Sequence, residues 1–125
     1  MSKDGRARAL LIEPDERYLR MLCDLCEEES LVPESASEGR EAIRLLDGDD
    51  YALIVLDLQV PGLDGFSIID FLRERKPALL ERVVVFTGFE NVREVAPEVP
   101  AVPKPNLGSL RYAIRRVIGA DRAAN

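Results

Sequence analysis

The sequence predicts a doubly wound α/β domain. Short apolar runs of strand length alternate along the chain with longer segments in which apolar residues recur at helical spacing. The run at 51–56 is apolar on both faces, which is typical of a central strand in a parallel sheet covered by helices on both sides. The 125 residues fit one domain, residues 1–125, with a core of its own.

The predicted elements follow in order along the chain. Five runs have the length and composition of strands: 7–12, 31–33, 51–56, 83–86 and 101–102. Four segments have the periodicity of amphipathic helices: 15–28, 37–48, 64–76 and 106–118. Pro33 indicates that the second run lies at a sheet edge. Residues 91–96 have room for about one helical turn, and the prolines that follow make the next region extended.

Residues at the boundaries support these helices. Asp15, Asp64 and Asn106 are each placed to cap a helix with a side-chain oxygen. Gly48 is expected to end the second helix. Pro77 is expected to stop the third, because proline cannot donate the backbone hydrogen bond that a helix interior needs.

Composition excludes several classes of function. The net charge of −6 argues against direct binding of nucleic acid or of an anionic membrane. No apolar run approaches the ~20 residues of a membrane span, and no signal-peptide pattern opens the chain, so we expect a cytoplasmic protein. The chain contains no histidine, so any phosphohistidine must come from a partner. Cys23 and Cys26 lie about two turns into a helical pattern, which favours packing over redox or zinc chemistry.

Polar side chains follow the predicted strands. Glu13 and Asp15 come after the first strand, Asp57 after the third, Thr87 after the fourth and Lys104 after the fifth. The carboxyl ends of parallel strands share one edge of the sheet, where ligands bind in such folds. We therefore expect three carboxylates, a hydroxyl and an ammonium to converge on one rim.

This set has a specific chemical use. Clustered carboxylates bind Mg²⁺, which offsets the charge of an incoming phosphoryl group and lets an aspartate attack it. A lysine and a hydroxyl can hold the remaining phosphoryl oxygens. Taken singly, each residue also has an ordinary structural explanation, as a cap, a turn residue or a solvated charge. The joint placement after successive buried strands favours the functional interpretation.

Three motifs carry a resemblance to a known family. Residues 53–65 read LIVLDLQVPGLDG, residues 83–88 read VVVFTG, and Lys104 is followed by Pro105. Together they resemble the phosphoacceptor strand and loop, the Thr/Ser strand and the Lys-Pro step of the CheY-like receiver domains of response regulators. The resemblance implies a flavodoxin-like, five-stranded parallel sheet of order 2-1-3-4-5 in a three-layer α/β/α sandwich, and a Lys-Pro bond that is often cis.

The resemblance also implies a role in two-component phosphorelay signal transduction. Asp57 would accept a phosphoryl group from a histidine kinase or a histidine phosphotransfer protein, and Thr87 and Lys104 would contact that group. The implied Mg²⁺ ligands are Glu13, Asp15, Asp57 and the backbone carbonyl of Gln59. Such a protein is not an enzyme beyond its own phosphorylation and dephosphorylation, and its output is a change in binding to another protein.

The sequence departs from the family pattern at three places. Pro14 stands where the family has the second residue of its acidic pair, so we expect weaker Mg²⁺ binding than in a typical receiver. Ala101 stands at the position of the family's switch aromatic. Only 17 positions separate Thr87 and Lys104, so the fourth helix is expected to be shortened or absent. The FTGF run at 86–89 and this short gap also resemble the atypical FAT GUY single-domain receivers.

Other functions remain to be weighed. Loss of metal binding through Pro14 would leave a phosphorylation-independent interaction module. A hydrolase of the haloacid-dehalogenase type is disfavoured because Gln59 replaces the acid that this chemistry needs two residues after the nucleophile. The arginines of the last helix, Arg111, Arg115 and Arg116, are a candidate docking surface or simply a solvated face.

Overall fold

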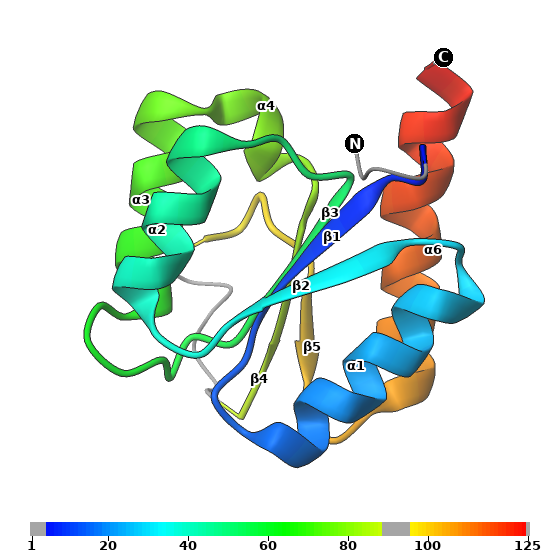
Figure 1. Cartoon of the computed structure of the whole chain (residues 1–125), viewed down its shortest axis with the longest axis horizontal. Helices are drawn as coiled ribbons and strands as arrows, with labels where there is room; N and C mark the ends of the chain where they lie inside the picture. Colours follow the sequence, from blue (N-terminus) through cyan, green and yellow to red (C-terminus); the bar gives the residue numbers. More distant parts are fainter. Residues whose placement is uncertain (1–4, 89–95, 125) are drawn as a thin grey trace.

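A computed structural model describes residues 5–88 and 96–124, with side chains as far as residue 119. One parallel sheet runs through the molecule in the order β2-β1-β3-β4-β5 (Figure 1). Its strands are β1 (Arg8–Ile12), β2 (Val32–Ala36), β3 (Leu53–Leu56), β4 (Val83–Thr87) and β5 (Ala101–Pro103). The described helices are α1 (Glu16–Glu28), α2 (Gly39–Gly48), α3 (Gly65–Arg75), α4 (Pro77–Leu80) and α6 (Leu107–Ala124). The predicted sheet and its order are confirmed.

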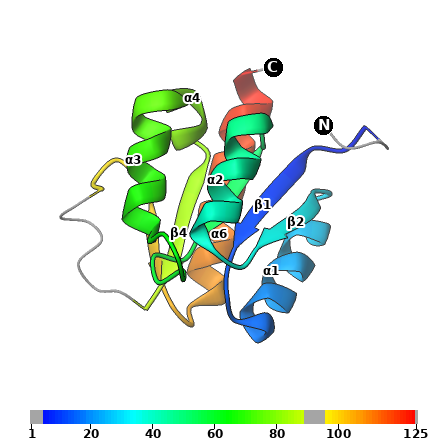
Figure 2. The same cartoon turned by 60° about the vertical axis from the view of Figure 1, so that its left-hand side comes forward.

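The helices form two layers, one on each face of the sheet. Helices α1 and α6 cover one face, where Leu22 and Ile114 lie in a single buried cluster with Val55 and Phe86 (Figure 1). Helices α2, α3 and α4 cover the other, and Figure 2 shows α2 and α3 side by side on it. The three-layer α/β/α prediction is therefore confirmed. Within the described residues, no helix is both long and apolar enough to cross a bilayer.

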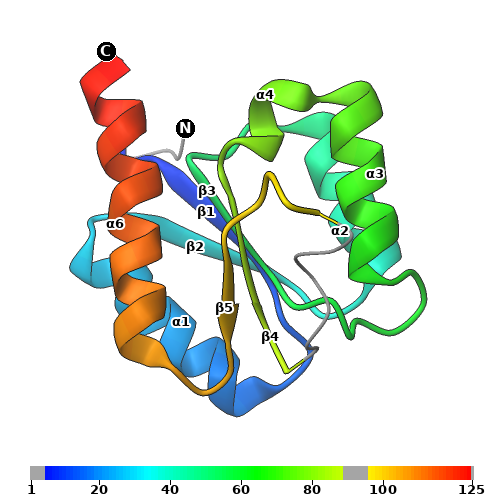
Figure 3. The same ribbon diagram turned by 180° about the vertical axis from the view of Figure 1, so that it is seen from behind.

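Burial along the strands follows their place in the sheet. Every residue of β3 and β4 is buried, because these central strands have helices on both faces. The edge strand β2 is mostly half-buried, and Figure 3 shows β5 at the opposite edge. The sequence placed Pro33 correctly at an edge, but the strand continues to Ala36, beyond the predicted 31–33. The polar residues Glu34 and Ser35 hid this extension, and an edge strand tolerates them because one side faces water.

The predicted caps hold for three helices. At the start of α1, Asp15 accepts from the backbone N–H groups of Arg17 and Tyr18. Asp64 accepts from that of Ser67 in α3, and Asn106 from that of Ser109 in α6. Helix α2 begins at Gly39, two residues later than predicted, after an N-cap Glu38 whose side chain makes no capping bond. Gly39 is required there, because a Cβ atom would lie 1.9 Å from the carbonyl oxygen of Leu63.

The prediction that the third helix stops at Pro77 is confirmed, but the sequence analysis did not predict the short helix that begins at this residue. Helix α3 ends at Arg75, and Pro77 is the first residue of the short helix α4. Proline suits a first helical position because its missing N–H would have no partner there in any case. The predicted shortening of the helix between β4 and β5 falls on residues 89–95, outside the described residues.

Candidate functional site

Four predicted site residues meet at the carboxyl edge of the sheet. Glu13 follows β1, Asp57 follows β3, Thr87 ends β4 and Lys104 follows β5. Backbone hydrogen bonds continue the ladder past the strand ends, from Asp57 N to Ile12 O (2.9 Å) and from Lys104 N to Thr87 O (3.0 Å). The sheet therefore fixes the backbone positions of these four residues. The predicted convergence is found for these four side chains.

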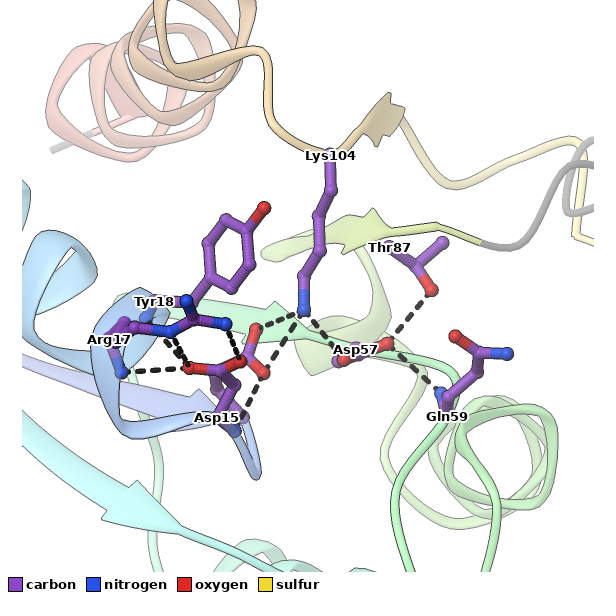
Figure 4. Close-up of polar contacts among 8 residues, drawn as sticks. Asp15, Arg17, Tyr18, Asp57, Gln59, Thr87 and Lys104 are labelled. Atoms are coloured by element: carbon purple, nitrogen blue, oxygen red, sulfur yellow. Dashed lines mark hydrogen bonds and ion pairs between the residues drawn. The ribbon is translucent and has the colours of Figure 1, made fainter.

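The Asp57 carboxylate is held from both sides (Figure 4). Its Oδ1 accepts hydrogen bonds from Thr87 Oγ1 (2.8 Å) and from the backbone N–H of Gln59 (3.0 Å), and its Oδ2 lies 2.9 Å from Lys104 Nζ. The residue is only 4% exposed. A carboxylate this buried needs such partners, because an unpaired buried charge is costly.

Lys104 bridges the two buried carboxylates. Its Nζ lies 2.9 Å from Glu13 Oε1 and 2.9 Å from Asp57 Oδ2. Burial by itself lowers the pKa of Lys104, but its hydrogen bonds to Asp57 and Glu13 outweigh that effect and hold the pKa above its ordinary value. Burial raises the pKa of Glu13, and the hydrogen bond from Lys104 only partly offsets this rise. The lysine is therefore a firmly charged cation between two acidic groups.

Asp15 does not join this group, and the expected convergence of three carboxylates is wrong on this point. Its Oδ1 accepts from the N–H of Arg17 (2.8 Å), and its Oδ2 pairs with the Arg17 guanidinium (3.2 Å). The bonds from Arg17 hold the pKa of Asp15 below its ordinary value. Figure 4 shows the carboxylate turned toward Arg17 and away from Asp57. Across residues 5–88 and 96–124, no group of three or more Asp, Glu, His or Cys side chains is placed to hold a metal ion together.

Sequence reasoning missed Tyr18. The Lys104 ammonium lies 4.2 Å from the centre of the Tyr18 ring, which packs edge-on against Phe86 at 5.7 Å between centroids. Figure 4 shows the Lys104 side chain reaching between Tyr18 and Asp57. In the sequence Tyr18 is one more apolar residue of an amphipathic helix, and its place in the first turn after the cap was the only available signal.

Three further predictions concern residues outside this group. The Lys104–Pro105 bond is cis, as the family resemblance implied. Cys26 is fully buried in the core, and burial raises the pKa of its thiol to about 12, in keeping with a packing role. On the last helix, Arg111 pairs with Glu28 at the end of α1, Arg115 pairs with the C-cap residue Glu29, and the Arg116 guanidinium lies over the Tyr112 ring. All three arginines of the predicted docking surface therefore contact other residues of the same chain.

Comparison with known proteins identifies the family. A model of the response regulator receiver domain matches residues 9–99. The transcriptional regulatory protein HprR of Escherichia coli is 39% identical over 69 residues, which are 55% of this chain and 31% of that protein. TcrA of Mycobacterium tuberculosis is 33% identical over 69 residues, 55% of this chain and 27% of that protein. The chain thus spans less than a third of the length of these relatives.

Solved structures agree on the fold. The receiver domain of the Francisella response regulator 1452 superposes with a TM-score of 0.79 at 22% identity, over 92% of this chain and 98% of that one. The receiver domain of the Pseudomonas aeruginosa sensor kinase PA1611, solved with magnesium in its active-site cleft, gives a TM-score of 0.77 at 20% identity, over 92% and 99%. The chain therefore belongs to the CheY-like receiver domain family of two-component response regulators.

Proposed function

We propose that this chain works as a phosphoryl-accepting switch, with Asp57 as the acceptor. The observation that carries the proposal is the set of contacts on the Asp57 carboxylate: a hydroxyl and a backbone N–H on one oxygen, and an ammonium on the other. These are the donors that a phosphoryl group needs once it is attached. Glu13, Asp57 and Thr87 are buried, and the side chain of Lys104 is 15% exposed.

The reaction follows from these groups. An oxygen of Asp57 attacks the phosphorus of a phosphohistidine, the phosphorus–nitrogen bond breaks, and the histidine keeps the bonding electrons. The product is an acyl phosphate on Asp57. The chain has no histidine of its own, so the donor is a histidine kinase or a histidine phosphotransfer protein.

Lys104 and Thr87 have matching tasks. Phosphorylation replaces the charge of the Asp57 carboxylate with the larger charge of a phosphoryl group. The Lys104 ammonium can move its hydrogen bond from the carboxylate to a phosphoryl oxygen while keeping its contact with Glu13. The Thr87 hydroxyl can donate to a second phosphoryl oxygen. Both donors act at the point where charge develops, which is where such groups are most effective.

The oxygen atoms at the site are of the type that binds Mg²⁺. Magnesium is bound by hard oxygen ligands and needs only one or two protein carboxylates. Glu13 and Asp57 would supply them, with the backbone carbonyl of Gln59 as a third protein ligand. When bound, the metal would offset the repulsion between the Asp57 carboxylate and the incoming phosphoryl group. Asp15 would have to leave its helix cap to take part, and Pro14 has no side-chain oxygen to offer.

A mass measurement tests the proposal. The protein is incubated with Mg²⁺ and acetyl phosphate, and its intact mass is recorded beside that of Asp57→Asn. We expect a gain of one phosphoryl group that Asp57→Asn lacks. Asp64→Asn is the matched control, because asparagine also caps helices well and Asp64 lies outside the site. Uptake by Asp57→Asn, or none by wild type, would contradict the proposal.

A phosphorylation-independent interaction module is the second candidate. The observation in its favour is Pro14, which removes a carboxylate from the acidic pair. In that case wild type takes up no phosphoryl group even at high Mg²⁺ concentration, whereas Pro14→Asp gains the ability to do so.

A further inference from the structure

We infer that Tyr18 is a positioning residue for Lys104: the face of its ring holds the ammonium in place between Asp57 and Glu13, and so sets the rate at which Asp57 is phosphorylated. The inference rests on the proposed function for its effect on rate. It rests on geometry alone for its effect on Lys104. Nothing in the sequence or in the comparisons assigns Tyr18 a role.

The first argument is the contact itself. The ammonium lies 4.2 Å from the centre of the Tyr18 ring and 5.9 Å from that of Phe86. A cation within about 6 Å of a ring face is attracted by its negative charge density, most strongly where water is excluded. Because Lys104 is mostly buried, water is largely excluded from its contact with Tyr18, and the cation–π attraction is expected to be strong.

The second argument is that the ring is fixed. Its edge-on contact with Phe86, at an angle of 78° between the rings, joins the first turn of α1 to the central strand β4. The backbone N–H of Tyr18 donates to the Asp15 carboxylate, which also accepts from Arg17. The cap therefore holds the turn that carries the ring. A fixed ring can direct a flexible side chain, because it narrows the positions open to the ammonium.

The third argument is that the flexible Lys104 side chain needs a contact that restricts its position. The lysine side chain has four rotatable bonds and is intrinsically flexible. Phosphorylation requires it to leave the Asp57 carboxylate and contact the new phosphoryl oxygens. During that exchange Glu13 and the Tyr18 ring are the contacts that stay unchanged. Without the ring, the ammonium would occupy the reactive position for a smaller share of the time.

Two substitutions separate the ring face from the bulk of the side chain. Tyr18→Phe keeps the ring and loses only the hydroxyl, whereas Tyr18→Leu keeps an apolar side chain and loses the ring. Tyr112→Leu is the matched control, because Tyr112 also contacts a cation, Arg116, but lies on α6 and is 63% exposed. Thermal unfolding of each variant establishes that it is folded.

The first readout is the NMR signal of the Lys104 Hε protons in the unphosphorylated protein. A proton above a ring face is shifted upfield by the ring current. We expect that shift in wild type, Tyr18→Phe and Tyr112→Leu, and its loss in Tyr18→Leu. Lys104 protons at ordinary positions in wild type, or unmoved in Tyr18→Leu, would overturn the inference.

The second readout is the rate of phosphorylation of Asp57 by acetyl phosphate. Loss of a cation–π contact of this kind should slow Tyr18→Leu by roughly threefold to tenfold, with Tyr18→Phe close to wild type. Equal rates for Tyr18→Leu and wild type would overturn the effect on rate while leaving the proposed function intact. No phosphorylation of wild type would overturn the proposed function and the effect on rate together, and the NMR signal would still decide the contact.

Discussion

Replacing Lys104 with methionine should leave two buried acids without their shared cation. Glu13 is 2% exposed and Asp57 4%, and Lys104 contacts both. Methionine has a similar length and apolar character, so the packing volume changes little. The main loss is electrostatic. Removing one partner of a buried ion pair costs about 3–5 kcal/mol, because the remaining charge stays buried and unpaired.

We therefore expect Lys104→Met to lower the free energy of unfolding by about 3 kcal/mol at neutral pH. The assay is urea unfolding followed by circular dichroism. Lys76→Met is the matched control, because Lys76 pairs with the exposed Asp50 at 3.8 Å, and such surface pairs contribute less than about 1 kcal/mol.

A second change identifies the cause. Adding Asp57→Asn to Lys104→Met removes one of the two unpaired acids and should restore part of the lost stability, with a coupling on the order of 1–2 kcal/mol. Mg²⁺ should also stabilise Lys104→Met more than wild type, since it replaces the missing positive charge. A loss below about 1 kcal/mol for Lys104→Met, equal to that of Lys76→Met, would refute the reasoning.

Three further predictions concern Asp15, Pro14 and Tyr51. Asp15→Ala should cost about 1 kcal/mol of stability through loss of the α1 cap, with Asp15→Asn near wild type, measured by urea unfolding. An equal loss of stability in Asp15→Ala and Asp15→Asn would contradict a capping role for Asp15. Pro14→Asp should tighten Mg²⁺ binding by roughly tenfold in a fluorescence or calorimetric titration, the effect of about 1.4 kcal/mol of added attraction. An affinity unchanged from wild type would contradict the weak-binding expectation. Burial, with the charge of Glu34 nearby, raises the pKa of Tyr51 to about 12, against about 10 in an unfolded chain. The unfolded chain then loses its proton first, so wild-type stability should fall between about pH 10 and 12, and Tyr51→Phe should show a flatter curve there.

The site was predictable where the topology of the sheet decides the position. Asp57 follows the buried strand β3, Thr87 ends the buried strand β4 and Lys104 follows the edge strand β5, and parallel strands bring such positions to one edge. The same rule placed Glu13 correctly. The rule could not decide which of the two acids after β1, Glu13 or Asp15, belongs to the site and which caps the next helix, because the sequence position of Asp15 suits either role. The structure distinguishes them through the bonds between Asp15 and the first turn of α1.

Tyr18 shows what the sequence could not reveal. Its contact is with Lys104, far away along the chain, and depends on how α1 packs against β4. Helical periodicity says only that one side of Tyr18 faces inward. Pro77 correctly marked the end of the third helix, but the sequence did not reveal helix α4, since a proline after a helix is compatible both with a loop and with a new helix that starts at that residue.

The most direct test of the account is to locate the phosphoryl group. After incubation with acetyl phosphate and Mg²⁺, reduction with borohydride converts an aspartyl phosphate to homoserine, which peptide mass spectrometry identifies by position. The account predicts homoserine at residue 57 in wild type, and none at that position in Asp57→Asn. Homoserine at another acid such as Asp64, or at no position, would contradict it.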